Sequence, residues 1–245
     1  MRTQIIAELA SNHGGNLSLA QDMIKAAADA GADFCKLQLY NAALLNDDDP
    51  QKAWLTKAQV DRPFLEACME TAFESGVTLT ASVFGPAEAQ MAYAAGLGTV
   101  KIGSGDSARW RLVKECALRF RAVWVSCGLK WFTRTLDCEH ALFYGVSQYP
   151  TPYMRGLAAL MQRPSGLPFS WSDHGADLEV AKEAILHGAT YLERHFSHGK
   201  EARWSKWDSD QAGLRELRDH AEACAWEGTD AHKAACAAYL GRWGR

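Results

Sequence analysis

The amino-acid sequence predicts an α/β fold, a (β/α)8 barrel of the TIM type formed by a single domain. Two observations carry this prediction: apolar strand candidates alternate with helical patterns along the whole chain, and eight such candidates can be counted. Alternation of this kind favours parallel βαβ units over an antiparallel sheet. The length of 245 residues, 48% of them hydrophobic, is enough to bury one full barrel core.

The expected strands are the eight apolar or aromatic runs at residues 4–9, 34–39, 77–82, 99–102, 122–126, 141–147, 167–171 and 190–193. The helices between them often end at a glycine, which readily adopts the left-handed conformation after a helix. Helices 17–30, 63–75, 86–95 and 177–187 end in this way at Gly31, Gly76, Gly96 and Gly188. Residues 127–140 leave room for barely two turns, so we expect an abbreviated or irregular fifth helix.

Two segments lie outside this regular pattern. The polar turn at residues 47–50 follows the second strand, and we expect a solvent-exposed loop there, with weaker support for a lid. The barrel should occupy residues 4–226, followed by a helical tail at 227–245. The aromatic residues of that region, Trp226, Tyr239 and Trp243, could cover the barrel or meet a second subunit in a homodimer.

Composition narrows the class of partner. A net charge of -3 provides no general basic field for nucleic acid, and no apolar run is long enough to cross a bilayer. The first residues lead directly into a strand without a targeting segment, so we expect a cytoplasmic protein. The seven cysteines contain no CxxC pair and resemble reduced core thiols. The expected partner is a small molecule.

Two histidines, His174 and His195, stand just past the ends of successive strands. In a (β/α)8 barrel the carboxyl ends of the strands form the rim where catalytic groups collect. Neutral imidazole is a common ligand of divalent metals, so a pair on two strand ends indicates a metal site. The alternative is that each is an ordinary hydrogen-bonded loop histidine. Their matching positions favour the metal site.

The remaining strand ends are unusually polar, and their side chains are Glu8, Lys36, Gln38, Ser82, Lys101, Ser104, Asp106, Ser126, Ser147, Tyr149, Ser172 and Glu193. Lysine is rarely buried without a partner, and an anionic ligand with phosphate or carboxylate groups would suit two lysines and several hydroxyls. A structural alternative pairs Lys36 with Glu8 and Lys101 with Asp106 as salt bridges. The glycines of residues 101–106 would also let the backbone approach an anion closely.

Six ordered segments carry a resemblance to a known family: residues 5–8 with 12–15, residues 31–38, residues 101–106, residues 147–150, residues 172–174 and residues 193–196. In these segments the chain resembles the sialic acid synthase family, also called N-acetylneuraminate synthases. Members of that family condense phosphoenolpyruvate with an N-acetylated amino sugar on a barrel. The resemblance runs from Ile5 to about Leu217.

The resemblance implies a role for each group at the rim. His174 and His195 match the positions that hold a divalent metal, usually Mn²⁺ or Mg²⁺, which polarises the sugar aldehyde. Lys36 and Lys101 match the lysines that bind phosphoenolpyruvate. The surrounding substrate-binding positions are Ser82, Ser104, Ser126, Ser147 and Ser172, with Gln38, Tyr149 and Glu193 completing the set. Glu8, Lys101 and Asp106 are the expected catalytic residues.

The implied reaction is attack of C3 of phosphoenolpyruvate on the aldehyde, addition of water at C2 and loss of phosphate. Asp106 stands where the family usually has a glutamate, and it is the candidate to position the water or relay a proton. The product would be a nonulosonic or other 2-keto-3-deoxy sugar acid. Two other classes stay open: a different metal-assisted barrel enzyme, such as an aldolase, lyase or phosphosugar hydrolase, and a non-catalytic phosphate-binding barrel.

The acceptor half of the site departs from the family pattern. Members usually continue into a small C-terminal antifreeze-like domain that contacts the sugar, and we expect only the catalytic barrel in the residues up to Arg245. The loop after His195 is also short. Its aromatic residues Trp204 and Trp207 are the expected lid over the acceptor. Because the departures lie in the acceptor half, the resemblance supports the class of reaction more strongly than the identity of the sugar.

Overall fold

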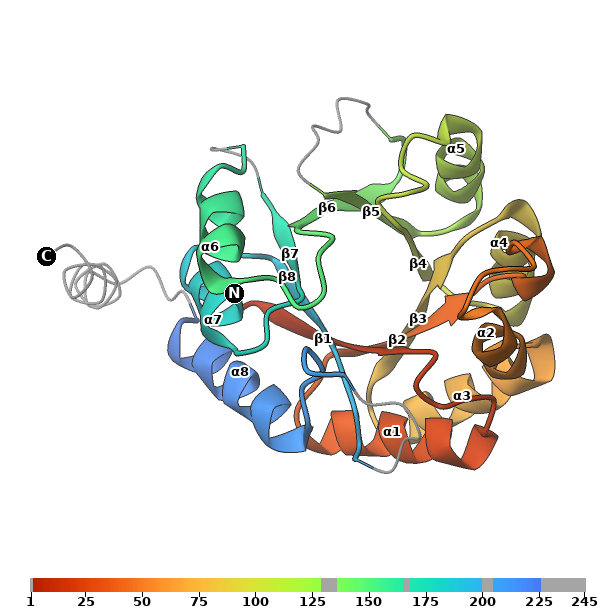
Figure 1. Cartoon of the computed structure of the whole chain (residues 1–245), viewed down its shortest axis with the longest axis horizontal. Helices are drawn as coiled ribbons and strands as arrows, with labels where there is room; N and C mark the ends of the chain where they lie inside the picture. The colour runs from red at the N-terminus through yellow and green to blue at the C-terminus, as the bar shows by residue number, and fades with distance from the viewer. Residues whose placement is uncertain (1, 129–135, 165–167, 200–204, 226–245) are drawn as a thin grey trace, which may run out of the picture.

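Eight parallel strands close into a barrel in the order β1 to β8, as the sequence predicts (Figure 1). The computed structural model describes residues 2–128, 136–164, 168–199 and 205–225. The strands are β1 (Gln4–Ala10), β2 (Phe34–Leu39), β3 (Thr78–Val83), β4 (Thr99–Ile102), β5 (Ala122–Gly128), β6 (Glu139–Gly145), β7 (Ser170–Asp173) and β8 (Tyr191–His195). Pairing of β1 with β8 closes the barrel.

The helices surround the barrel on the outside (Figure 1). They are α1 (Leu17–Asp29), the 3-10 helix η1 (Ala42–Leu44), α2 (Lys52–Ala58), α3 (Arg62–Glu74), α4 (Pro86–Ala95), α5 (Trp110–Arg119), α6 (Tyr153–Met161), α7 (Glu179–Leu186) and α8 (Gln211–Ala223). Side chains of Asn16, Asp61 and Asp210 cap α1, α3 and α8 by accepting a backbone N–H of the first turn. The four glycines expected to end helices all have positive φ.

Some element bounds differ from the sequence-based expectation. The expected loop at residues 47–50 is present and mostly exposed, but η1 and the short helix α2, which were not expected, lie on either side of it. The sixth strand was expected at 141–147 and the seventh at 167–171, but β6 ends at Gly145 and β7 extends to Asp173. Apolar content alone does not show where the hydrogen-bonded pairing of neighbouring strands begins and ends, which explains why the bounds of both strands differ. The expected fifth helix and tail lie largely in residues 129–135 and 226–245, outside the described residues.

The barrel interior is divided into two layers. Because successive side chains on a strand point to opposite faces, residues two apart share the interior. Near the amino ends of the strands a small apolar cluster of Ile6, Trp124 and Phe143 fills the barrel, with Phe34 and Tyr191 packed against it. Two residues further along the strands, Lys36 and Glu193 occupy the next positions. The main apolar cluster contains residues from both strands and helices, and it packs the helices onto the outside of the barrel.

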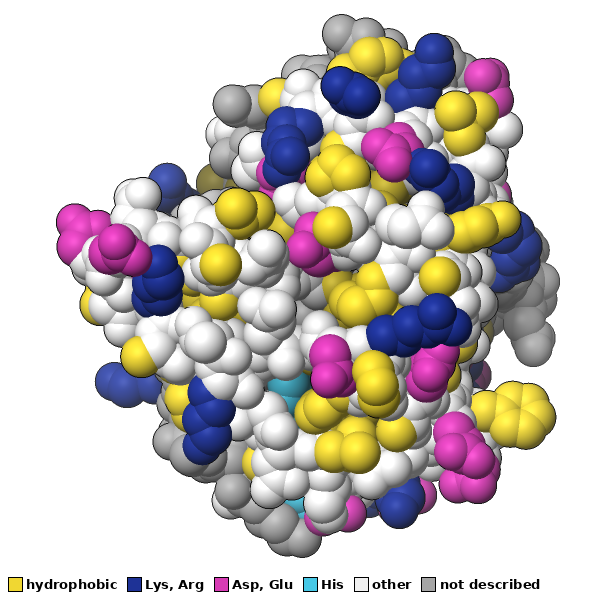
Figure 2. All heavy atoms as spheres, turned by 90° about the vertical axis from the view of Figure 1, so that its right-hand side faces the viewer, with side chains coloured by type: hydrophobic (Ala, Val, Ile, Leu, Met, Phe, Trp, Pro, Cys, Tyr) yellow, Lys and Arg dark blue, Asp and Glu magenta, His cyan; other side chains and the backbone are white. Residues whose placement is uncertain are grey.

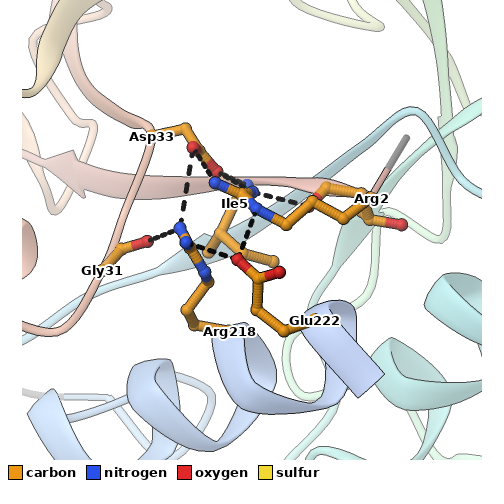
Figure 3. A network of polar contacts seen from close by, with 7 residues as sticks. Arg2, Ile5, Gly31, Asp33, Arg218 and Glu222 are labelled. Carbon is orange, nitrogen blue, oxygen red and sulfur yellow. Dashed lines mark hydrogen bonds and ion pairs between the residues drawn. The ribbon is translucent and has the colours of Figure 1, made fainter. Parts of the chain in front are cut away.

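A network of charges ties α8 to the first two strands at the amino end of the barrel (Figure 3). The Arg2 guanidinium donates to both carboxylate oxygens of Asp33, at 2.7 and 2.6 Å. Arg2 also contacts Glu222 of α8 at 2.9 Å, and Arg218 of α8 donates to the carbonyl of Gly31. Asp33 in turn accepts the backbone N–H of Ile5 at 2.7 Å. This clamp fixes α8 across the β1 and β2 edge.

The outer surface over α2, α3 and α4 is mixed in character (Figure 2). Apolar side chains on this face occur in small groups among charged side chains of both signs. Phe73 of α3 and Tyr93 of α4 are exposed singly, which is normal on a solvated surface. Within the described part of the chain, no helix is both long and apolar enough to cross a membrane.

Candidate active site

A cavity of about 240 Å³ opens at the carboxyl ends of the strands. Every predicted site residue lines it: Glu8, Lys36, Gln38, Ser82, Lys101, Ser104, Asp106, Ser126, Ser147, Tyr149, Ser172, His174, Glu193 and His195. The other lining residues are Phe84, Gly103, Gly105, Gly128 and Gly145. The structure therefore gathers the predicted groups into one place, and their individual roles stay predictions.

Lys36 is buried at the base of the cavity among oxygen atoms from three strands. Its ammonium group forms an ion pair with Glu8, donates to Ser82 Oγ at 2.6 Å and lies 3.4 Å from Glu193 Oε2. Only 2% of the Lys36 residue is exposed. The structural alternative proposed from the sequence is thus correct for the pair of Lys36 and Glu8.

The same alternative is wrong for Lys101, which pairs with Glu193 and not with Asp106. Lys101 Nζ lies 2.6 Å from Glu193 Oε1 and donates to Ser172 Oγ at 2.8 Å. It also stands 4.2 Å above the ring centre of Phe143, a favourable contact for a cation. The sequence did not reveal this pairing because β4 and β8 are not neighbours, and their side chains meet only across the barrel.

Burial and charge shift the pKa values of these lysines in opposite directions. Burial lowers the pKa of Lys101 to about 8, and the nearby Glu193 offsets only part of that effect. Burial acts in the same sense on Lys36, but Glu193 and Glu8 together outweigh it and raise its pKa. Glu193 is also buried, yet the two lysines lower its pKa. Burial raises the pKa of Glu8, and the ammonium group of Lys36 offsets only part of that effect.

A local irregularity in β1 orients the Glu8 carboxylate. The pairing register of β1 with β2 shifts between Glu8 and Ala10, and Ala10 has a φ of 50°, which is unusual for a residue with a side chain. The backbone N–H of Ala10 donates to Glu8 Oε1 at 2.8 Å. Bulges of this kind often re-aim side chains next to active sites. Here the second Glu8 oxygen is directed at Lys36.

The two predicted histidines face each other across the rim, with ring centres 5.7 Å apart. Burial lowers the pKa of His174 to about 4 and that of His195 to about 3, so both rings are neutral near pH 7. His174 Nδ1 lies 2.8 Å from the carbonyl of Val146, which makes that nitrogen the protonated one and leaves Nε2 with a lone pair. Tyr149 lies close by, with its ring centre 4.2 Å from that of His174 and the two rings tilted by 46°.

The histidine pair fits a divalent ion that keeps open coordination positions. Two neutral imidazoles supply nitrogen ligands, and the backbone bond to Nδ1 of His174 fixes its tautomer as outer partners of metal ligands do. Across residues 2–128, 136–164, 168–199 and 205–225, no group of three His, Cys, Asp or Glu side chains is positioned to hold an ion. The remaining positions of such an ion would be open to other oxygen ligands, water and substrate included.

A buried ion pair supports both histidines from the outer side of the barrel. Asp173 precedes His174, Arg194 precedes His195, and these two side chains form a hydrogen-bonded ion pair. Arg194 also donates to the carbonyl of Gly175 at 2.9 Å and to Ser209 Oγ at 2.6 Å. The pair therefore links the loops that follow β7 and β8. Sequence reasoning missed it, although a charged residue before each histidine was a usable signal.

The loop after β4 contributes an open backbone surface to the cavity. A side chain placed at Gly103 or Gly105 would meet nothing within 4 Å, so both glycines leave space beside the backbone. Asp106 at the end of this loop accepts from Arg109 at 2.8 Å, and the same guanidinium nitrogen donates to the carbonyl of Phe84. Arg109 is a rim residue that the sequence analysis missed, because a single arginine in a loop carries no pattern.

One of the two expected lid residues lies beside Tyr149, which lines the cavity. Trp207 packs edge-on against Tyr149 with ring centres 5.6 Å apart. The loop that carries it is held by Asp208, which accepts from Asn12 at 3.2 Å, and by pairing between Ser197 and Ser209. Trp204, the other expected lid residue, lies outside the described residues. Trp207 extends the aromatic wall that Tyr149 begins.

Comparison with known proteins identifies the family. A sequence model of the NeuB family matches residues 23–224. The N,N'-diacetyllegionaminic acid synthase of Campylobacter jejuni is 24% identical over 229 residues, which covers 81% of this chain and 69% of that protein. The N-acetylneuraminate-9-phosphate synthase of Drosophila melanogaster is 26% identical over 230 residues, covering 82% of this chain. This chain covers 62% of that relative's length.

Solved structures show the same fold. The N-acetylneuraminic acid synthetase of Leptospira borgpetersenii superposes with a TM-score of 0.81 at 22% identity, covering 100% of this chain and 94% of that one. A truncated 3-deoxy-D-arabino-heptulosonate 7-phosphate synthase of Thermotoga maritima superposes less closely, with a TM-score of 0.66 at 15% identity over 90% of this chain. The closed barrel and the family match over most of its length agree, and the chain belongs to the NeuB family.

Proposed function

We propose that this protein condenses phosphoenolpyruvate with an amino sugar of the N-acetylmannosamine type to give a nonulosonic or other 2-keto-3-deoxy sugar acid and phosphate. The observation that carries the proposal is the position of two buried lysines, Lys36 and Lys101, at the base of a cavity whose rim holds two neutral histidines. The relatives reported above are synthases of N,N'-diacetyllegionaminic acid and of N-acetylneuraminate 9-phosphate, which supports this reaction class.

The lysine cluster would bind the phosphate and carboxylate of phosphoenolpyruvate. Each ammonium group already donates to a hydroxyl, Lys36 to Ser82 and Lys101 to Ser172. A hydroxyl is a replaceable partner because it can rotate away or donate its own proton to an arriving oxygen. Ser104 and Ser147, whose oxygens are 3.5 Å apart at the rim, add further donors. Charge-assisted bonds of this type are the strong ones for phosphate recognition.

The reaction balances with these two substrates and one water. A bond forms between C3 of phosphoenolpyruvate and the aldehyde carbon of the sugar, and the aldehyde oxygen becomes a hydroxyl. Water adds at C2, the C2 carbon loses its bond to the phosphate oxygen, and phosphate leaves as C2 becomes a ketone. Asp106, held by Arg109, is the proposed residue that orients the water or accepts its proton.

His174 and His195 are the proposed ligands of a divalent metal, with Mn²⁺ or Mg²⁺ as the expected ion. When bound, such an ion acts as a Lewis acid that polarises an aldehyde oxygen. The chain itself prepares this position by keeping both rings neutral and by fixing His174 against the Val146 carbonyl. The Asp173 and Arg194 pair holds the two loops at a set spacing.

The acceptor sugar is proposed to lie against Tyr149 and Trp207 at the cavity mouth. Their rings form one continuous aromatic wall beside His174 and His195. Apolar faces of sugar rings pack well on such surfaces, while the polar rim satisfies the hydroxyls. Formation of a homodimer and a cytoplasmic location stay predictions.

The test is release of inorganic phosphate from phosphoenolpyruvate by the full chain with Mn²⁺, across a panel of aldoses that includes N-acetylmannosamine and its deoxy analogues. We expect release that requires both an aldose and the metal, with formation of a sugar acid detected by mass. Phosphate release without any aldose would indicate a hydrolase instead. Absence of turnover with saturable phosphoenolpyruvate binding would favour the non-catalytic barrel.

A further inference from the structure

The loop after β4 carries an arginine, Arg109, whose side chain joins two residues of the candidate active site. One guanidinium nitrogen, Nη1, donates to Asp106 Oδ1 at 2.8 Å and to the carbonyl of Phe84 at 2.9 Å. Asp106 and Phe84 both line the cavity at the carboxyl end of the barrel, whereas Arg109 is not among its described lining residues. Arg109 therefore contacts the candidate catalytic carboxylate from outside the cavity.

The backbone is fixed on both sides of this bridge. Arg109 immediately precedes α5, and its carbonyl accepts the backbone N–H of Val113 at 3.2 Å, which ties it to the first turn of that helix. Phe84 follows β3, and its backbone N–H donates to the carbonyl of Leu39, the last residue of β2, at 3.1 Å. The guanidinium group thus connects the loop after β4 to a segment that is itself bonded to the neighbouring strand.

The Asp106 carboxylate depends on this contact for its orientation. Within the described part of the chain, Arg109 is the one residue that bonds this carboxylate, and it engages Oδ1 and leaves Oδ2 for another partner. The backbone beside it offers space, since a side chain placed at Gly103 or Gly105 would meet nothing within 4 Å. Without Arg109, no described side chain would hold the carboxylate in one position.

The exposure of this ion pair indicates what it contributes. The Arg109 side chain is 51% exposed and that of Asp106 is 19% exposed. Ion pairs this open to solvent add little to the free energy of unfolding, because water competes for both charges. Placement of a general base matters far more, since it must lie within hydrogen-bond reach of the proton that it accepts. The main effect of the pair is therefore on the direction of the carboxylate and not on stability.

We propose that Arg109 is a positioning residue that acts on the reaction through Asp106. It holds Oδ1 of Asp106, and Oδ2 then faces the water that adds at C2 of phosphoenolpyruvate. This inference rests on the reaction proposed above and adds to it a residue outside the cavity. Because Arg109 touches neither substrate, its removal slows turnover and leaves substrate binding nearly unchanged.

The kinetic test separates turnover from binding. Arg109→Ala should lower kcat by about ten- to hundredfold, as a misplaced catalytic group does, while the KM for phosphoenolpyruvate changes by less than about twofold. Arg111→Ala, at an exposed position of α5, is the matched control and should keep the normal kcat. If Arg109→Ala fails to fold, Arg109→Met replaces it, since methionine has a side chain of comparable reach without the donors.

A double variant tests whether Arg109 acts through Asp106. Asp106→Asn removes the carboxylate, so Arg109→Ala should cause no further loss of kcat when it is added to that variant. A further tenfold loss in the double variant would overturn the proposal, because Arg109 would then act by another route. A rise in the KM for phosphoenolpyruvate as large as the fall in kcat would also overturn it and would make Arg109 a binding residue.

Crystal structures of the unmodified chain and of Arg109→Ala provide a test that needs no turnover. The Asp106 carboxylate should occupy one position in the unmodified chain and several positions in the variant, while the distant Glu8 carboxylate stays in place as an internal control. An Asp106 carboxylate that keeps its position without Arg109 would overturn the proposal. If no aldose supports phosphate release by the unmodified chain, the proposed reaction fails, and the crystal structures alone decide whether Arg109 positions Asp106.

Discussion

The two ends of the barrel are built by the same eight strands but serve different purposes. At the carboxyl end the interior positions hold lysines, glutamates, hydroxyls and histidines, while at the amino end they hold aromatic rings. Phe143 belongs to both, because its ring stacks on Tyr191 in this aromatic layer and also contacts the Lys101 ammonium group. The charged groups at the carboxyl end therefore rest on an apolar layer that the same strands supply at the amino end.

The two ends should also contribute differently to the free energy of unfolding. Aromatic burial stabilises the fold, whereas buried lysines and carboxylates contribute little net stability because desolvation offsets their attraction. Substitutions at the amino end should therefore act mainly on stability, and those at the carboxyl end mainly on binding and turnover.

The largest effect is expected at the histidines. His174→Ala or His195→Ala should abolish metal-dependent turnover and leave the free energy of unfolding nearly unchanged, because rim ligands contribute little to core packing. Turnover is measured by phosphate release and stability by urea denaturation. A large loss of stability in either variant would show that the carboxyl end is also structural.

Trp124→Ala tests the opposite end. Removing this buried ring from the aromatic layer should lower the free energy of unfolding by about 3 to 5 kcal/mol, as for other large-to-small changes in cores. The affinity of the folded variant for phosphoenolpyruvate should change much less than its stability. Urea denaturation and calorimetry measure the two quantities. A loss of affinity without a loss of stability would contradict the division between the two ends.

Lys101→Ala should weaken phosphoenolpyruvate binding by roughly tenfold or more, because a charge-assisted contact contributes about 1.5 to 3 kcal/mol. Lys114→Ala, at an exposed position of α5, is the matched control and should bind normally. Isothermal calorimetry measures both. Unchanged affinity in the Lys101 variant would make that lysine a structural partner of Glu193 only.

The carboxyl end should also make the free energy of unfolding depend on pH under acidic conditions. Burial lowers the pKa of His13 to about 4, from an unfolded value near 6.5, and its Nε2 has no partner among the described residues. The unfolded chain then binds more protons between these pH values, so stability falls as the pH falls from 6.5 towards 4, by up to about 1.4 kcal/mol per pH unit. His13→Gln should reduce that slope in denaturation curves recorded across this range. An unchanged slope would exclude His13 as a source.

The smallest effect is expected at the cavity mouth. Trp207→Ala should raise the KM for the aldose or lower kcat by a few-fold, with phosphoenolpyruvate affinity nearly unchanged, because the ring contacts Tyr149 and not the lysine cluster. Steady-state kinetics with each substrate varied in turn provide the measurement. Equal losses for both substrates would point to a folding defect.

The sequence predicted the barrel and the residues of its rim because both follow from local rules. Strand-like runs alternating with helical patterns define the fold, and parallel strands bring their carboxyl ends together. Side-chain pairings across the barrel could not be predicted from the sequence. Lys101 and Glu193, for example, lie far apart in the chain and on strands that are not neighbours. The short helix α2 was also missed, because a single seven-residue segment has too few turns to show a clear period.

The clamp of Arg2, Asp33, Arg218 and Glu222 has a consequence for biosynthesis (Figure 3). Its partners come from the first and last parts of the barrel, as do the paired strands β1 and β8. A ribosome delivers β8 and α8 after the rest of the barrel, so neither the clamp nor the pairing of β8 with β1 can form until synthesis of the barrel is nearly complete. Until then the edges of β1 and of the growing sheet stay open, which is the period when nascent chains associate with one another or with chaperones.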